Sequence, residues 1–198
     1  FGAYCKTLGT AFGNPLYHWS QVELKEFFGC ELEINEENAE KIWEQCNDYI
    51  AKNDVTPTSL IERSNVKCVV TTNEVFDDLT TFEKIKEKGY KFTVIPAFRA
   101  DKIMNIEAEK YNDFIGLLEE KTSKINDLKD LEAALETRLE AFIKVGCRAS
   151  DIALESVYPV ADGKLAEEVF LKRRSGKAVT EEETKEFKGY LTYFLMKM

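Results

Sequence analysis

The chain has 198 residues, of which 44% are hydrophobic and 32% charged, a composition typical of a globular protein with a sizeable core. Its formal net charge of −9 argues against nucleic acid and anionic membranes as partners, because both select clustered lysine and arginine. No apolar run approaches the roughly 20 residues of a membrane span, and no secretory signal is visible, so we expect a cytoplasmic protein.

The first 64 residues have the pattern of helices. Residues 19–29 are apolar on one face and end at a glycine, and residues 34–50 repeat apolar side chains at helical spacing. Asn35 is the expected cap of that second helix. Thr56 and Pro57 predict a short third helix, with threonine as its cap and proline in its first turn.

Strands and helices alternate between residues 65 and 158. The runs VKCVVTT (66–72) and FTVIPAF (92–98) predict buried strands, and CRASDIAL (147–154) predicts a third. Amphipathic stretches separate them, namely DLTTFEKIKEKG, IEAEKYNDFIGLLEE and DLKDLEAALETRLEAFIKVG. This order predicts an α/β fold with a parallel sheet and helices packed outside it.

The last part predicts two more helices, GKLAEEVFLKRRSG and TEEETKEFKGYLTYFLMKM, the second opened by a capping box of Thr180 and Glu183. We expect the basic run KRRSGK (172–177) to face solvent. Three parallel strands would leave two open sheet edges, which suggests part of a larger fold, with a small three-layer domain as the alternative. The predicted divisions of the chain are residues 1–64, 65–158 and 159–198.

The five cysteines are odd in number, widely spaced and without a CxxC pair. This pattern predicts free thiols that lie mostly in cores, not a disulfide framework or a cysteine metal site. The single histidine, His18, cannot by itself complete a histidine-based metal site. We expect His18 to be a packed residue, with a catalytic base as the alternative.

Polar residues follow each predicted strand, at the edge where parallel α/β folds place their binding sites. Glu74 follows the first strand, Arg99, Asp101 and Lys102 follow the second, and Asp151 lies in the third. An arginine there can bind a carboxylate or phosphate through two parallel hydrogen bonds, which points to a small anionic substrate. The alternative is that Arg99 and Asp101 cap a helix or pair with each other.

Several stretches, in order along the chain, resemble the uronate isomerases, also called glucuronate isomerases. GNPLYHW and ELKEFFG resemble an early helical segment of that family. IPAFRADK resembles its strand ending in Trp/Phe-Arg-Pro-Asp-Lys/Arg, and GCRASD resembles its Gly-Cys-x-x-Ser-Asp strand. The resemblance implies about three parallel strands of a (β/α)8 TIM barrel of the amidohydrolase type, with residues 1–64 as a large helical insertion.

The resemblance also implies isomerisation of D-glucuronate to D-fructuronate and of D-galacturonate to D-tagaturonate. Arg99 matches the family arginine that grips this sugar-acid substrate, with Asp101 and Lys102 beside it, so these three are the expected substrate-binding residues. Asp151 and His18 are the remaining catalytic candidates. The family's divalent metal ion, zinc, is held by residues outside the matched segment, so we expect no metal ligand in this chain. We expect the chain to be an inactive fragment, and open sheet edges favour a homo-oligomer.

Three departures from the family pattern raise an alternative function. The family's Thr-Thr-Asp-Asp-Pro is TTNEV (71–75) here, the proline after its arginine is Ala100, and its Ser-Asp-His ends in Ile152. Replacing the histidine with isoleucine removes a polar group from the expected rim of the barrel. The alternative is therefore a non-catalytic binding or assembly domain on a degenerate uronate isomerase scaffold.

Overall fold

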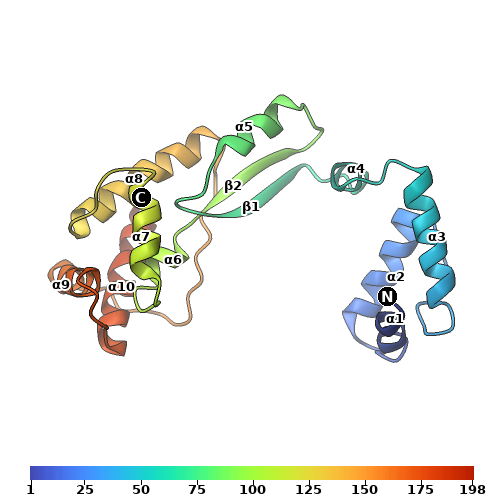
Figure 1. Cartoon of the computed structure of the whole chain (residues 1–198), viewed down its shortest axis with the longest axis horizontal. Helices are drawn as coiled ribbons and strands as arrows, with labels where there is room; N and C mark the ends of the chain where they lie inside the picture. The colour runs from blue at the N-terminus through green and yellow to red at the C-terminus, as the bar shows by residue number, and fades with distance from the viewer. The chain divides into compact units, whose positions relative to one another are not determined.

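The computed structural model describes all residues from Phe1 to Met198, which form two compact units, residues 1–66 and 67–198 (Figure 1). No helix combines the length and the apolar composition that a membrane crossing requires. All five cysteines are free, and three of them are buried, as the sequence predicts: Cys5, Cys30 and Cys147.

The first unit consists of four helices, α1 (Gly2–Leu8), α2 (Pro15–Phe28), α3 (Ala39–Lys52) and α4 (Pro57–Arg63). Its small core is mostly apolar and contains Cys5, Leu8, Cys30, Ile34, Ala39 and Ile42. The predicted cap of α4 is confirmed, because the Thr56 side chain accepts a hydrogen bond from the Ser59 amide. The predicted cap of α3 is wrong, because Asn35 instead accepts a hydrogen bond from the Asn38 amide and closes a turn before the helix begins.

Two polar side chains join the helices and loops of the first unit. Gln21 of α2 donates to the Leu32 carbonyl at 2.8 Å and accepts from the Ile34 amide at 3.0 Å. Arg63, at the end of α4, donates to two carbonyls in the last turn of α2, those of Glu26 and Phe27. Arg63 thereby supplies partners for carbonyls at a helix end, where intrahelical donors run out.

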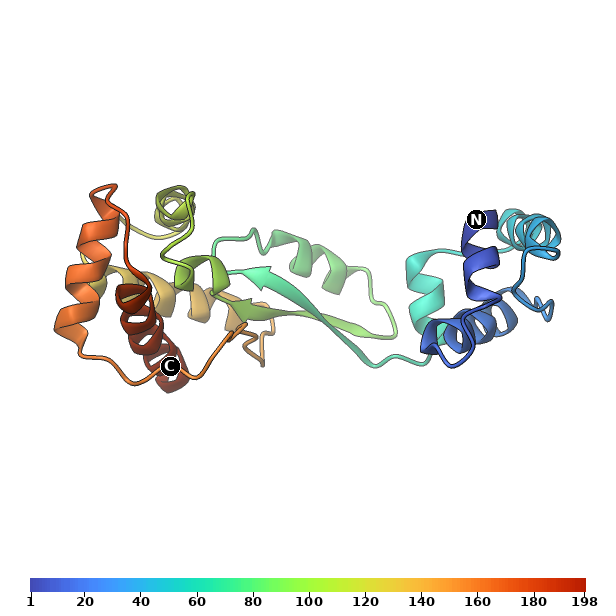
Figure 2. The same ribbon diagram turned by 90° about the horizontal axis from the view of Figure 1, so that it is seen from below.

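The second unit contains two strands and six helices. They are β1 (Cys68–Glu74), α5 (Thr80–Glu87), β2 (Thr93–Arg99), α6 (Asp101–Met104), α7 (Tyr111–Glu119), α8 (Leu128–Lys144), α9 (Gly163–Arg174) and α10 (Glu181–Lys197). α5 connects the parallel strands β1 and β2, which confirms the predicted strand–helix–strand unit (Figure 2). The register pairs Cys68 with Thr93 and Glu74 with Arg99, so the two strands end at the same level.

The predicted third strand over residues 147–154 is wrong in extent. This segment makes a single parallel bridge, between Ser150 and Phe98 of β2. The Phe98 amide donates to the Ala149 carbonyl at 2.9 Å, and the Asp151 amide donates to the Phe98 carbonyl at 3.1 Å. The ladder stops there because the Ala153 amide donates to a side chain instead, that of Asp101. The sheet therefore has two strands, not three.

β1 is only partly buried, which corrects the prediction of a buried strand. Cys68 is exposed and Val70 is 49% exposed, whereas Ala97 and Phe98 of β2 are almost fully buried. β1 pairs with β2 alone, so its other edge carries no neighbouring strand. β-branched composition predicts a strand, but burial depends on what packs against it.

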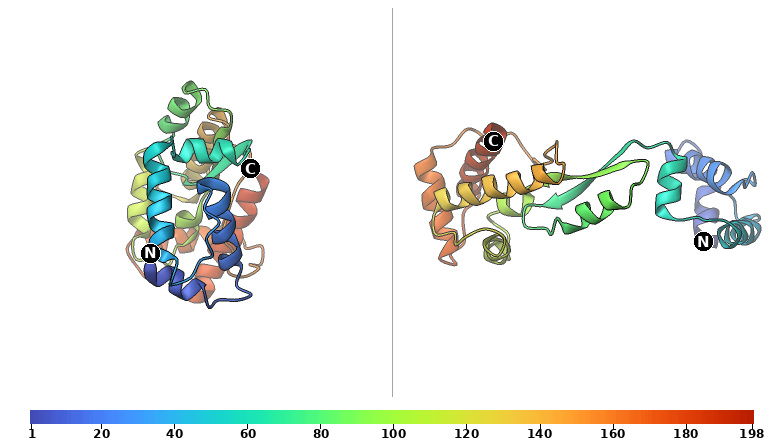
Figure 3. Two further views of the ribbon diagram at one scale, coloured as in Figure 1. Left: turned by 90° about the vertical axis from the view of Figure 1, so that its right-hand side faces the viewer. Right: turned by 90° about the horizontal axis from the view of Figure 1, so that it is seen from above.

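The core of the second unit lies among α7, α8, α9, α10 and the end of β2 (Figure 3). The amphipathic pattern predicted for α8 is confirmed by an apolar stripe, with Leu128, Leu131, Leu135 and Phe142 buried and Leu139 packed against them. Phe98 meets Phe142 edge-on, with ring centroids 5.2 Å apart, and this contact joins β2 to α8. The predicted capping box of α10, between Thr180 and Glu183, is also confirmed.

Arg138 is a charged residue inside the apolar stripe of α8. Its Nε donates to the Val75 carbonyl at 2.5 Å, and its terminal nitrogen donates to the Asp77 carbonyl at 2.8 Å. These bonds fix the loop after β1 and satisfy two carbonyls beside the core. Sequence reasoning missed this role, although an arginine between Leu135 and Phe142 on the buried face was the available signal.

The prediction that the basic run 172–177 faces solvent is only partly confirmed, because Lys177 is exposed whereas Arg173 and Arg174 are partly buried and bound to other segments. Arg173 donates to the carbonyls of Ile106, Ala108 and Glu109 at 2.7 to 3.1 Å. Arg174 pairs with Glu119 at 3.0 Å. The prediction failed for these two arginines because their partners lie more than fifty residues away in the sequence, where no local pattern reveals them.

We predict that Gly189→Ala destabilises the protein. A Cβ atom at Gly189 in α10 would lie 2.0 Å from the Pro159 carbonyl oxygen, which belongs to the backbone and cannot rotate away. The change should lower the free energy of unfolding by about 2 kcal/mol or more, because this overlap outweighs the helix propensity that alanine gains over glycine. Denaturant unfolding measures the difference.

Gly116→Ala in α7 is the matched control, since nothing lies within 4 Å of its added Cβ atom. We expect that change to raise the free energy of unfolding by about 0.5–1 kcal/mol. A Gly189→Ala protein as stable as the Gly116→Ala protein would contradict the close approach of residues 158–159 to α10.

Candidate functional site

Charged side chains from three segments meet where β1 and β2 end. Glu74 ends β1 and Arg99 ends β2, directly opposite each other in the register. Asp101 and Lys102 open α6, immediately after β2. Asp151 follows the bridge that places its segment beside β2. Parallel pairing therefore brings the carboxyl ends of three segments to one edge, where α/β folds commonly bind ligands.

Arg99 is the centre of the ion pairs at this edge. Its Nε donates to Asp101 Oδ2, and its Nη1 lies 3.8 Å from Asp151 Oδ2. The hydrogen bond and charge of Asp101, aided by Asp151, raise the pKa of the Arg99 guanidinium, which therefore stays charged. The Arg99 side chain is 30% exposed, so a ligand can still reach it. Of the two alternatives open from the sequence, pairing of Arg99 with Asp101 is present in the structure.

Lys102 contacts aromatic rings and not a carboxylate. Its Nζ lies 5.4 Å from the ring centroids of both Phe76 and Phe114, within the range of cation–π contacts. Its backbone amide lies 3.4 Å from Glu74 Oε2. These contacts tie α6 to the end of β1 and occupy the ammonium group that the sequence assigns to substrate binding.

Glu74 is half-buried, and burial raises the pKa of its carboxyl group above the ordinary value. The Lys102 amide and the positive charges of Lys102 and Arg99 act in the opposite direction. Asp77 closes the turn after β1, since its Oδ2 accepts from the Glu74 amide at 3.0 Å and from Asn73 Nδ2 at 3.3 Å. Sequence reasoning did not identify Asp77, although an aspartate three residues after a strand is a common turn signal.

The other catalytic and metal expectations involve different parts of the chain. The expectation that His18 is packed is wrong, because His18 is an exposed residue of α2 in the first unit. Its catalytic role stays a prediction. No three or more histidine, cysteine, aspartate or glutamate side chains are grouped so that they could hold a metal ion. The residues of this chain therefore do not by themselves form a complete metal site, and the divalent ion that the family resemblance implies stays a prediction.

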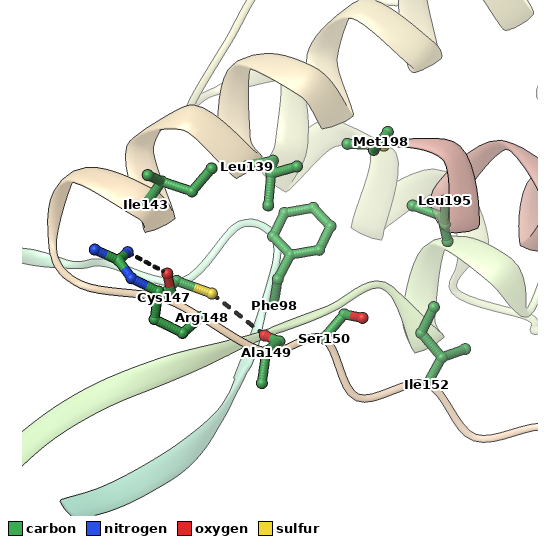
Figure 4. Close-up of a pocket in the computed structure, with 10 residues that line it drawn as sticks. All are labelled: Phe98, Leu139, Ile143, Cys147, Arg148, Ala149, Ser150, Ile152, Leu195 and Met198. Carbon is green, nitrogen blue, oxygen red and sulfur yellow. Dashed lines mark hydrogen bonds between the residues drawn. The ribbon is translucent and has the colours of Figure 1, made fainter.

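A separate pocket of about 440 Å³ lies beside Phe98, between the 147–152 segment and the ends of α8 and α10 (Figure 4). Its walls are mostly apolar and include Leu139 and Leu195. Ile152, where the resemblance implies a histidine, also lines it. Neighbouring strand residues point to opposite faces, so Arg99 faces away from this pocket. The charged side chain that lines this pocket, Arg148, donates to the Cys147 carbonyl at 2.6 Å and the other walls are mostly apolar, so the Arg99 side suits an anionic ligand better.

Comparison with known proteins identifies the family. The profile of the glucuronate isomerase family matches residues 1–198. The chain is 42% identical to the uronate isomerase of Caldanaerobacter subterraneus subsp. tengcongensis and 38% identical to that of Clostridium perfringens. Both alignments cover the whole chain but 43% of each relative, so the chain spans less than half the length of these curated relatives.

Solved structures give the same result. The crystal structure of uronate isomerase from Thermotoga maritima superimposes with a TM-score of 0.93 at 29% identity, over 99% of this chain and 44% of that one. The glucuronate isomerase from Caulobacter crescentus superimposes with a TM-score of 0.90 over 99% of this chain and 41% of that one, and at 23% identity this likeness shows a shared fold. Since the family profile matches every residue, the chain belongs to the glucuronate isomerase family.

Proposed function

We propose that this chain forms part of a uronate isomerase that converts D-glucuronate to D-fructuronate and D-galacturonate to D-tagaturonate. The observation that carries the proposal is the partly exposed Arg99 guanidinium at the carboxyl end of β2, in a chain of this family. β1, β2 and residues 149–151 are then neighbouring strands of a (β/α)8 barrel. The parallel register and the bridge on the far side of β2 support that arrangement.

Arg99 binds the carboxylate of the sugar acid in this proposal. Its Nε is taken by Asp101, but its Nη1 lies 3.8 Å from Asp151, which is too far for a hydrogen bond. The terminal nitrogens are therefore available to donate two parallel hydrogen bonds to a ligand carboxylate. The Asp151 side chain is 51% exposed, so it has room to shift when a ligand carboxylate binds Arg99.

Isomerisation of an aldose to a ketose moves hydrogen between adjacent carbons and needs a proton-transfer group. Asp151 is the catalytic candidate in the second unit, because its carboxylate approaches the same guanidinium that would hold the substrate. The residues of this chain do not assemble a site for the family's divalent ion, so we assign no step to that ion here. We therefore expect the chain alone to lack activity.

The edge holds more carboxylates than cations, which opposes binding of another anion. Glu74, Asp101 and Asp151 lie near Arg99 and Lys102, and the Lys102 ammonium is already engaged with aromatic rings. Burial is the main cause of the raised pKa of Glu74, and the nearby charge of Asp101 raises it further. A uronate binds here only if Arg99 compensates for this repulsion.

We predict that Arg99→Ala weakens D-glucuronate binding at least about ten-fold, because it removes a charged, two-point contact. Arg99→Lys should give a smaller loss, since lysine keeps the charge but not the planar pair of donors. Lys102→Met should change the affinity less than about three-fold, because the Lys102 ammonium lies over Phe76 and Phe114. Isothermal titration calorimetry measures all four proteins. If neither the wild-type chain nor Arg99→Ala binds D-glucuronate detectably, the result would instead favour the assembly alternative.

We predict no turnover when the 198-residue chain is incubated with D-glucuronate and zinc or another divalent ion. A coupled assay for D-fructuronate measures this directly. Turnover at the usual enzymatic rates, on the order of 1 per second or faster, would show that no essential group is missing from this chain.

We predict that Glu74→Gln stabilises the chain more at pH 7 than at pH 4. A carboxyl group whose pKa is raised on folding contributes stability that is present below its ordinary value, 4.5 for glutamate, and is lost as pH rises through the folded pKa. Glutamine carries no charge and avoids that loss. Asp130→Asn should behave oppositely, because hydrogen bonds from Asn126 lower the Asp130 pKa. Equal pH dependence of both variants in denaturant unfolding would contradict this account.

A further inference from the structure

Both carboxylate oxygens of Asp101 have partners within the chain. Oδ2 accepts the hydrogen bond from Arg99 Nε, and Oδ1 accepts one from the Ala153 amide at 2.9 Å. The Asp101 side chain is only 13% exposed, so little of it can meet a ligand. Each Asp101 oxygen thus already has a partner within the chain, and its low exposure leaves little access for a substrate.

The two partners of Asp101 belong to the two segments that line the edge. Arg99 ends β2, and Ala153 lies two residues beyond Asp151. The backbone hydrogen bonds between residues 149–151 and β2 end at the Asp151 amide. The next hydrogen bond that holds this segment joins the Ala153 amide to the Asp101 carboxylate. The carboxylate of Asp101 therefore sets the position of Asp151 relative to the Arg99 guanidinium.

Ala100 makes the hydrogen bonds of Asp101 more important for the geometry of the turn that follows β2. Proline fixes φ near −65°, and the family pattern has proline directly after the arginine. Ala100 has a φ of −116°, outside the range that a proline ring allows. The turn between Arg99 and Asp101 is therefore not held by a ring, and the Asp101 hydrogen bonds are the contacts that hold its geometry.

We propose that Asp101 is a positioning residue and not a substrate-binding one. It aims the Arg99 terminal nitrogens at the ligand carboxylate and holds the 150–153 segment beside them. This inference rests on the proposed function only for the identity of the ligand, a sugar-acid carboxylate. The two hydrogen bonds of Asp101 are present in the chain whatever the ligand is. It replaces the direct substrate contact that the sequence suggests for Asp101.

The competing explanation treats Asp101 as an anion that merely opposes a second anion at Arg99. The two explanations predict opposite changes in the affinity for D-glucuronate. If Asp101 only competes, removing its charge tightens D-glucuronate binding. If Asp101 positions Arg99, removing its charge weakens binding, because the guanidinium loses its fixed orientation.

The experiment compares the wild-type chain with Asp101→Asn and Asp101→Glu. Asparagine keeps one acceptor oxygen and loses the charge, whereas glutamate keeps the charge and moves it by one methylene. We expect both variants to weaken D-glucuronate binding at least about five-fold by calorimetry. Asp113→Asn is the matched control, because it removes an exposed carboxylate from α7 and should leave the affinity unchanged. Tighter binding by Asp101→Asn, or unchanged binding by Asp101→Glu, would overturn the proposal.

A second readout does not require the ligand. Amide hydrogen exchange of Ala153 should be at least about ten-fold faster in Asp101→Asn than in the wild type, and unchanged in Asp113→Asn. The Arg99 Nε–H resonance should broaden through exchange with water in the same variant only. If the wild-type chain does not bind D-glucuronate, the proposed function fails while these two signals still decide the role of Asp101. Unchanged exchange at both sites would overturn the positioning role.

Discussion

The parallel pairing of β1 with β2 is the constraint on which the rest of the second unit depends. Because Glu74 lies opposite Arg99 in the register, the two strands end together and their polar residues share one edge. A shift of one residue would move every side chain of a strand to the other face and separate these groups. Phe98 fixes the same end from the opposite side, through its edge-on contact with Phe142 of α8.

Arginine side chains hold the loops around this paired core. Arg138 binds two carbonyls of the loop after β1, and Arg173 binds three carbonyls of the loop between α6 and α7. Loop carbonyls lack the regular partners of a helix or sheet, so a buried guanidinium can satisfy several of them at once. The loop after β1 and the loop between α6 and α7 are therefore held by hydrogen bonds from arginine side chains, whereas the terminal nitrogens of Arg99 are open to a ligand.

Family membership and the charged edge together define what this chain contributes. The family is shown over every residue, but the chain covers 43% of the length of its first relatives, so the activity of a whole uronate isomerase remains a proposal for it. The apolar residue at position 152 lines a pocket on the other side of β2 from Arg99. The isoleucine, at a position where the resemblance implies a histidine, therefore forms part of the wall of that pocket.

The amino-acid sequence by itself determined the local elements of this protein. The helical periods, the Thr56 and Thr180 caps, the α8 stripe and the two strands all depend on residues near one another in the chain, where propensity and spacing are informative. The family also followed from sequence, because its motifs occur in order over nearly the whole length.

Only the tertiary structure decided which partners these elements have. It limited the 147–154 segment to one bridge, left β1 partly exposed, and turned Arg173 at the end of α9 toward loop carbonyls. It also placed Asp101 between Arg99 and Ala153, and Lys102 over two aromatic rings. Each of these outcomes depends on contacts between distant residues, whose energies are set by burial and geometry that a local pattern does not contain.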